Sequence, residues 1–316
     1  MLTSLPRHAR YLGAAAALAG VAGCGPAEAR DSSPATEPTL EFATRRLADG
    51  VRVRYAVQGA PGGRAVILLH GYSDSWYSFS PVLPLLPSEL RVYALDQRGH
   101  GESDRPRTGY ALTDLAGDVI GLMDAEGISH AVIVGHSMGS LVAQQVARMA
   151  PARVERLVLV GSAPSFRSMP GAMDFAAAVH ELTDPVSVEF IEEFQRSTIH
   201  RPLPDSFVAR VIDESRKLPA YVWHGIVDGM VAAGPARELG TAKIPTLLLW
   251  GEKDAVFPRE AQDSLLAMIP GAELEVYLET GHAVHWERPE EFVSDLMAFL
   301  RKPVALSDGV VRRAPL

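Results

Sequence analysis

The sequence predicts an α/β fold in which a mostly parallel sheet is flanked by helices and carries an inserted helical cap. Three observations lead to this prediction. Six short, strongly apolar runs are separated mostly by segments of helical length, and continuous apolarity is typical of parallel strands covered on both faces. A hairpin pattern precedes these runs, and a stretch of about eighty residues interrupts their rhythm after position 160.

The folded part is expected to begin near Leu40 with an antiparallel hairpin. Predicted strands at 40–47 and 51–57 flank Asp49-Gly50, a dipeptide favoured in tight hairpin turns. The six apolar runs that follow are predicted strands at 65–69, 92–95, 131–134, 157–160, 246–250 and 274–278. Helical spacing of apolar residues predicts helices at 112–126, 141–149, 259–268 and 290–300.

The interruption is predicted to be a helical cap at 163–240, inserted between two parts of the sheet domain at 40–162 and 241–302. A structureless loop of that length is improbable in a compact domain, so the stretch needs structure of its own. Four amphipathic segments within it predict helices at 175–182, 186–195, 207–218 and 221–232. The pattern fades near Pro303, which predicts a loose tail at 303–316.

Composition narrows the classes of function. The chain of 316 residues has a net charge of −8 and no basic stripe interleaved with aromatic residues, which argues against a nucleic-acid surface. Its one cysteine, Cys24, allows no intrachain disulfide, and no pattern resembles a zinc cluster or a calcium loop. We therefore expect no nucleic-acid partner, no metal and no cofactor.

The first 24 residues have the pattern of an export signal. Basic side chains precede a small apolar run at 12–22, which is too short to span a bilayer comfortably. The run ends in Val21-Ala22-Gly23-Cys24, which resembles the bacterial lipobox and implies a lipid anchor on Cys24. The alternative is an ordinary export signal with a leftover cysteine.

The following residues, 25–39, are rich in Pro, Ala, Ser, Thr and acids and predict a disordered tether. Together with the signal, they predict an exported, lipid-anchored protein of a bacterial cell envelope, so the membrane is an expected partner. Gly25 stands where resembled lipoproteins retained in the inner membrane often carry Asp, which points to the outer membrane.

A candidate nucleophile lies in Gly135-His136-Ser137-Met138-Gly139, between the predicted strand at 131–134 and the predicted helix at 141–149. A Gly-x-Ser-x-Gly turn in that context holds the serine in a strained backbone conformation and exposes its hydroxyl. The glycines let strand and helix cross closely, because a Cβ there would clash.

At this point the chain resembles the α/β-hydrolases, specifically the cap-bearing esterase, lactonase and haloperoxidase-like group. The resemblance runs from about Leu40 to Leu300 and implies the α/β-hydrolase fold. Five pieces in family order carry it: His70-Gly71-Tyr72, the turn from Asp96 to Ser103, the serine elbow, Gly251-Glu252-Lys253-Asp254, and Gly281-His282.

Ser137, Asp254 and His282 occur in the chain order of triads on this fold. Asp254 and His282 each follow a predicted strand, so both are expected at the sheet edge that carries the elbow. Histidine can accept the serine proton near neutral pH, and a carboxylate on its other nitrogen fixes the tautomer. The resemblance further implies that the backbone N–H groups of Tyr72 and Met138 form the oxyanion hole.

Other residues compete for these roles. His285 is the alternative histidine, interpreted as a surface or pocket-wall residue. The alternative acids are Glu252, Asp263 and Asp228, of which Asp228 is expected on the cap. Three further histidines, interpreted as turn or supporting residues hydrogen-bonded to the backbone, are His70, His100 and His136. Asp96 and Arg98 are interpreted as a turn-stabilising pair.

The expected activity is hydrolysis of a small-molecule carboxylic ester or lactone through an acyl-enzyme. The serine at the elbow disfavours the resembled dehalogenases and epoxide hydrolases, which use Asp there. Two alternatives remain: a carbon–carbon bond hydrolase of ring-cleavage products, suggested by Trp286, and a non-catalytic surface lipoprotein that uses the fold for binding. Candidate residues for an apolar acyl pocket, which otherwise hold the cap together, are Phe166, Met169, Phe175, Trp223, Met230 and Val256.

Overall fold

The computed structural model describes residues 39–305 and 311–312. The predicted signal, Cys24 and all of the predicted tether except residue 39 lie outside the described residues. No helix in the described part of the chain is both long and apolar enough to cross a membrane.

An eight-stranded sheet forms the centre of the molecule, with the strand order β1-β2-β4-β3-β5-β6-β7-β8. The first two strands run antiparallel to their neighbours, and every pairing from β4 to β8 is parallel. The strands are β1 (Glu41–Arg46), β2 (Arg52–Gln58), β3 (Arg64–Leu69), β4 (Leu90–Asp96), β5 (Ala131–His136), β6 (Val154–Val160), β7 (Thr246–Gly251) and β8 (Glu273–Tyr277). The predicted fold class is confirmed.

Both faces of the central strands are buried, which explains their continuous apolarity. Alternate residues point to opposite faces. Ile67 and Leu69 of β3 join a core with α1 (Leu112–Ala125) and α2 (Met138–Met149). Val66 and Leu68 join a second core with α10 (Pro289–Arg301).

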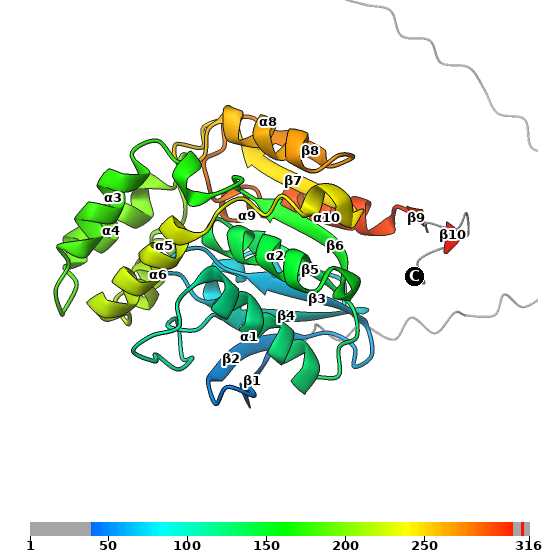
Figure 1. The fold of residues 1–316 in the computed structure, drawn as a ribbon, viewed down its shortest axis with the longest axis horizontal. Helices are drawn as coiled ribbons and strands as arrows, with labels where there is room; N and C mark the ends of the chain where they lie inside the picture. Colours follow the sequence, from blue (N-terminus) through cyan, green and yellow to red (C-terminus); the bar gives the residue numbers. More distant parts are fainter. Residues whose placement is uncertain (1–38, 306–310, 313–316) are drawn as a thin grey trace, which may run out of the picture. The chain divides into compact units, whose positions relative to one another are not determined.

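Helices fill the predicted interruption between β6 and β7. They are α3 (Ala172–His180), α4 (Val188–Ser197), α5 (Asp205–Ser215), α6 (Ala220–Ala232) and the short α7 (Leu239–Ala242). Figure 1 shows α3 to α6 gathered at one end of the sheet. Tyr72, which follows β3, donates its hydroxyl to the Trp223 carbonyl of α6 at 2.7 Å, so this end is the carboxyl edge of the parallel strands.

The remaining elements are short or peripheral. The 3₁₀ turns η1 (Trp76–Phe79) and η2 (Leu83–Leu85) lie between β3 and β4, while η3 (Pro151–Arg153) and η4 (Phe166–Ser168) flank β6. Near the C-terminus lie α8 (Arg259–Met268), α9 (Val284–Glu287), and the paired two-residue strands β9 (Val304–Ala305) and β10 (Val311–Arg312). Thus part of the stretch predicted as a loose tail is paired; its residues 306–310 and 313–316 lie outside the described part.

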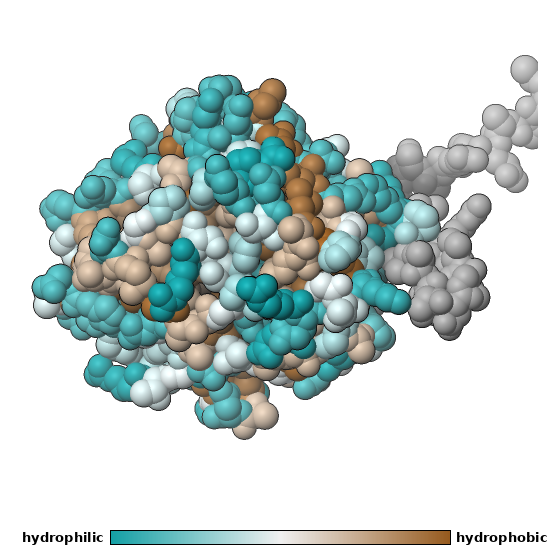
Figure 2. Space-filling model, turned by 45° about the horizontal axis from the view of Figure 1, so that its top comes forward, coloured by the Kyte–Doolittle hydropathy of each residue, from teal (hydrophilic) through white to brown (hydrophobic). Residues whose placement is uncertain are grey.

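Two features of the surface follow from this topology. The hairpin turns at Asp49-Gly50, where Gly50 has φ +92° and Asp49 Oδ1 accepts the Val51 N–H at 3.0 Å. The last parallel strand, β8, is an edge strand, and Val276 on it is 39% exposed. The surface shown in Figure 2 is mainly hydrophilic, with hydrophobic side chains in a narrow band and scattered points.

Candidate active site

Ser137 lies at a sharp turn between β5 and α2. Its backbone has φ 52° and ψ −119°, a strained conformation for a residue with a side chain. A Cβ on Gly135 would lie 2.2 Å from the Gly139 carbonyl oxygen, and one on Gly139 would lie 2.2 Å from the Leu69 carbonyl oxygen. Both glycines are therefore required for the close crossing of the elbow, as the sequence predicted.

Asp254 and His282 are in direct contact. Asp254 Oδ2 lies 2.8 Å from His282 Nδ1. The other oxygen, Oδ1, accepts the backbone N–H groups of Val256 at 2.8 Å and Phe257 at 2.9 Å, which orient the carboxylate. Because an ionised carboxylate only accepts hydrogen bonds, Nδ1 carries the proton and Nε2 is left as the basic nitrogen.

His282 is held closely by the chain around it. The backbone N–H of His282 donates to the Thr198 carbonyl oxygen at 3.0 Å. A Cβ added to Gly161, which has φ +50°, would lie 2.9 Å from His282 Nδ1. The buried Nε2 has no hydrogen-bond partner among the described residues, and a catalytic contact of this kind often tightens only when substrate binds.

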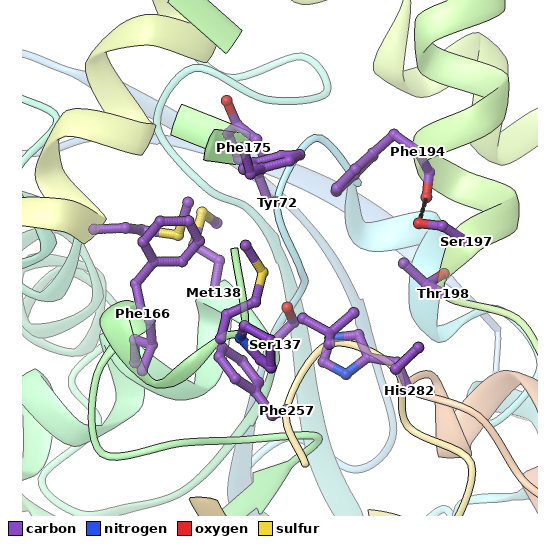
Figure 3. A pocket seen from close by; sticks show the side chains of 16 residues that line it. Tyr72, Ser137, Met138, Phe166, Phe175, Phe194, Ser197, Thr198, Phe257 and His282 are labelled. Carbon is purple, nitrogen blue, oxygen red and sulfur yellow. Dashed lines mark hydrogen bonds between the residues drawn. The ribbon is translucent and has the colours of Figure 1, made fainter. Parts of the chain in front are cut away.

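Ser137 and His282 line the same cavity, of about 200 Å³, beneath the cap. Figure 3 shows both side chains at its floor, with Phe166 on one side and Phe194, Ser197 and Thr198 on the other. Five of the six predicted pocket residues line it: Phe166, Met169, Phe175, Met230 and Val256. The sixth, Trp223, is fully buried in the core behind Tyr72, and α4 contributes lining residues that the sequence did not indicate.

Tyr72 and Met138 also line this cavity. Met138 is the first residue of α2, so its N–H has no acceptor within the helix and lies at the positive end of the helix dipole. The Tyr72 hydroxyl is committed to the Trp223 carbonyl, and burial raises the pKa of this phenol well above its usual value. Its side chain therefore attaches the loop to the cap.

The competing acids lie elsewhere and contact other groups. Asp263 pairs with Arg259 at 2.8 Å, and Asp228 on α6 lies 2.9 Å from His180. Glu252 lies 3.4 Å from Lys253, its ion-pair partner. Of the acids weighed from the sequence, Asp254 is the one in contact with His282.

His70 and His100 support turns, as predicted. His70 Nε2 accepts the Gln97 N–H at 3.0 Å, and His100 Nε2 accepts the Ser73 N–H at 3.3 Å. Burial lowers the pKa of His70 to about 4 and that of His100 well below its ordinary value, so both are neutral. His136 differs, because neither ring nitrogen has a hydrogen-bond partner among the described residues.

The interpretation of His136 as bonded to the backbone was therefore wrong, and two others were wrong as well. His285 is neither on the surface nor in the pocket wall: it is fully buried, lies 3.1 Å from Ser78 Oγ, and burial lowers its pKa to about 3. Asp96 and Arg98 do not pair. Asp96 accepts two backbone N–H groups, whereas the Arg98 guanidinium binds Asp118 and Asp49 across the molecule.

Sequence reasoning missed a set of buried polar groups around the site. Asp74 is fully enclosed, and burial raises the pKa of its carboxyl to about 7. Gln195 and Glu287 are also buried. Gln195 lies in the amphipathic helix α4, and Glu287 ends the four-residue helix α9, which the sequence did not predict. In the described ranges, no three His, Cys, Asp or Glu side chains are grouped as a metal site requires.

Comparison with known proteins gives a consistent result. A model of the alpha/beta hydrolase fold family matches residues 64–289. An uncharacterized protein of Mycobacterium tuberculosis is 29% identical over 86% of this chain and 83% of its own length. The dihydrolipoyllysine-residue acetyltransferase component of the acetoin cleaving system of Pseudomonas putida is 32% identical over 80% of this chain and 68% of its own. The structure of the esterase RhEst1 from Rhodococcus, 27% identical, superposes with a TM-score of 0.74 over 82% of this chain and 98% of its own.

Proposed function

Because the chain belongs to the alpha/beta hydrolase fold family, we propose that it is a serine hydrolase that cleaves neutral carboxylic esters or lactones through an acyl-enzyme. The observation that carries this proposal is the pairing of Asp254 with His282 Nδ1 at 2.8 Å, with His282 and Ser137 on one cavity. The similarity to the Rhodococcus esterase supports it.

In the first half-reaction, His282 Nε2 removes the Ser137 proton while Oγ attacks the carbonyl carbon of the ester. The carbonyl oxygen becomes an oxyanion, which accepts hydrogen bonds from the backbone N–H groups of Tyr72 and Met138. Collapse of the tetrahedral intermediate breaks the bond from carbon to the alcohol oxygen. The proton held on Nε2 passes to that oxygen, and the alcohol leaves.

The second half-reaction repeats these steps with water as the nucleophile. Nε2 removes a proton from water, which attacks the acyl carbon, and the same backbone donors bind the second oxyanion. Breaking the bond to Ser137 Oγ releases the acid and returns the proton to the serine. Asp254 accepts from Nδ1 throughout and stabilises the imidazolium formed in each half-reaction.

The cavity favours a neutral substrate. Apolar and sulfur-containing side chains dominate its lining, and no Lys, Arg, Asp or Glu of the described part of the chain lines it. A carboxylate bound there would lose hydration with no cation to compensate it. Extradiol ring-cleavage products carry such a carboxylate, so the cavity disfavours the carbon–carbon hydrolase alternative. The non-catalytic alternative is disfavoured for another reason: it gives no role to the strained Ser137 backbone or to the Asp254–His282 pair.

A fluorophosphonate tests the nucleophile directly, because only an activated serine reacts quickly with it. We expect one labelled peptide, carrying Ser137, and no rapid labelling of Ser137→Ala. Ser197→Ala is the matched control, since it removes the other serine hydroxyl that the described residues contribute to the cavity lining, and it should still be labelled at Ser137. A modified peptide without Ser137 would contradict the proposal.

We also propose that the full chain is exported and anchored through lipid on Cys24. The apolar run before the single cysteine supports this proposal. Expression of the full chain in a bacterial host, followed by membrane fractionation, tests it. Membrane association that is unchanged in Cys24→Ser would contradict a lipid anchor on this residue.

A further inference from the structure

The loop after β3, which carries the Tyr72 N–H, is linked to the cap by a buried amide. Gln195 on α4 is 2% exposed. Its Nε2 lies within hydrogen-bond distance of Ser73 Oγ at 3.1 Å, Asp74 Oδ1 at 3.0 Å and Ser215 Oγ of α5 at 2.9 Å. A single side chain therefore joins two cap helices to the residues directly after Tyr72.

The loop that carries His282 is linked to the same part of the cap by a buried carboxylate. Glu287 Oε2 accepts the N–H groups of Gly281 at 2.9 Å and Arg201 at 3.1 Å, and Oε1 accepts the N–H of His200 at 2.9 Å. The contact leaves no spare room, since a Cβ on Gly281 would lie 2.6 Å from Glu287 Oε1. The His282 N–H adds a fourth bond, to the Thr198 carbonyl oxygen.

These two links leave from opposite ends of one short segment, residues 195–201. Gln195 at its start contacts the Tyr72 loop, and Thr198, His200 and Arg201 contact the His282 loop directly or through Glu287. The segment also contributes Ser197 and Thr198 to the cavity lining. The cap is thus connected to both loops that supply chemistry to Ser137.

We propose that the 195–201 segment sets the distance between the oxyanion donor at Tyr72 and the base at His282, with Gln195 and Glu287 as positioning residues. This inference rests on the proposed acyl-enzyme chemistry. Such a reaction requires its groups to be placed within about 0.5 Å, and a misplacement of about 1 Å can lower the rate about a hundredfold.

The two residues act on different groups, so their variants have different signatures. Gln195→Met keeps the length of the side chain but removes the donor to Ser73 and Asp74. We expect kcat and the fluorophosphonate rate at Ser137 to fall about tenfold to a hundredfold, with KM changed less than about threefold. The downfield proton NMR signal of His282 Nδ1–H should stay as in wild type.

Glu287→Gln keeps the shape of the side chain but turns one acceptor oxygen into a donor that faces backbone N–H groups. We expect a similar fall in kcat, together with a shifted pH profile and a shifted or broadened Nδ1–H signal, because the His282 loop is released. The NMR signal needs no substrate, so it tests this half of the proposal even if no ester is hydrolysed.

Matched controls separate positioning from loss of stability. Gln58→Met removes a buried glutamine whose Nε2 donates to the Leu83 carbonyl at 2.6 Å, remote from the cavity. Glu126→Gln alters a carboxylate that accepts the Tyr55 hydroxyl at 2.6 Å. Both controls should keep wild-type kcat and the wild-type Nδ1–H signal even where thermal unfolding shows lower stability.

The inference is overturned if folded Gln195→Met and Glu287→Gln match these controls in kcat, labelling rate and Nδ1–H signal. If either variant does not fold, Ser73→Ala and Glu287→Asp weaken the same links and are held to the same comparison. Wild type that labels at Ser137 but cleaves no ester would contradict the proposed substrate class alone, since labelling rates still report positioning.

Discussion

Replacing Asp254 with asparagine changes one heavy atom of the candidate site. The hydrogen bonds around this side chain determine which nitrogen of His282 then carries the proton. Oδ1 accepts two backbone N–H groups, from Val256 and Phe257. The asparagine oxygen must stay there, because its NH₂ group in that position would face two donors. The NH₂ group therefore faces His282 Nδ1, which must become an acceptor, and the proton moves to Nε2.

With Nε2 protonated, that nitrogen has no lone pair to receive the Ser137 proton. We expect kcat/KM to fall about 10⁴-fold, or about 5 kcal/mol in the barrier. The free energy of unfolding should change by less than about 1 kcal/mol, since both backbone bonds to the residue remain. Asp254→Ala would instead leave two buried N–H groups unpaired and should be less stable by a few kcal/mol.

The assay is the hydrolysis of a chromogenic ester by purified Asp254→Asn and wild type, with chemical denaturation of both. The fluorophosphonate rate at Ser137 should fall in parallel with kcat/KM. A variant that keeps its stability and retains kcat/KM within about tenfold of wild type would refute the reasoning, because another group would then orient His282.

Three further predictions concern residues around the triad. Burial raises the pKa of Asp74 to about 7, so the stability that the neutral carboxyl contributes is present in full below about pH 4 and is lost as the pH rises through 7. Asp74→Asn mimics the neutral acid, so at pH 8 its free energy of unfolding should exceed that of wild type by up to about 4 kcal/mol. Denaturation curves at several pH values should show that the variant lacks the pH dependence of wild type. Gly161→Ala places a Cβ 2.7 Å from the His282 carbonyl oxygen and 2.9 Å from Nδ1, so kcat should fall about a hundredfold; an active alanine variant would show that the His282 loop yields freely. Tyr72→Phe should keep kcat within about tenfold, because the backbone N–H of this residue is the group that acts in the oxyanion hole. The variant should lose about 1 kcal/mol of stability, because its hydrogen bond to the Trp223 carbonyl is lost. A thousandfold loss of kcat would mean that the hydroxyl takes part in the chemistry.

The central sheet could be predicted from the sequence because its strands are buried on both faces. Continuous apolar runs such as 131–134 are typical of strands that are covered on both faces. The glycines around Ser137 indicate that a strand and a helix cross closely there. The location of Asp254 and His282 at one edge of the sheet could also be predicted, because residues that follow parallel strands meet there. Their catalytic roles stay predictions, although the structure brings the two side chains into contact.

Long-range polar contacts could not be predicted. Gln195 meets Asp74 across 121 positions, and Glu287 meets His200 across 87. A single polar residue on an amphipathic helix has the same pattern whether it faces water or a buried partner. His285 was misplaced because its buried partner, Ser78, lies 207 positions away in the sequence. Arg98 was misplaced because its partners Asp118 and Asp49 come from a helix and a hairpin turn.

The most direct test of the proposed function is hydrolysis of neutral chromogenic esters of graded acyl length by residues 40–316, with Ser137→Ala measured beside wild type. We predict turnover that is lost in Ser137→Ala, with an optimum at short to medium apolar acyl groups that fit a cavity of about 200 Å³. Folded wild type that cleaves none of these esters, or a Ser137→Ala variant that still does, would contradict it.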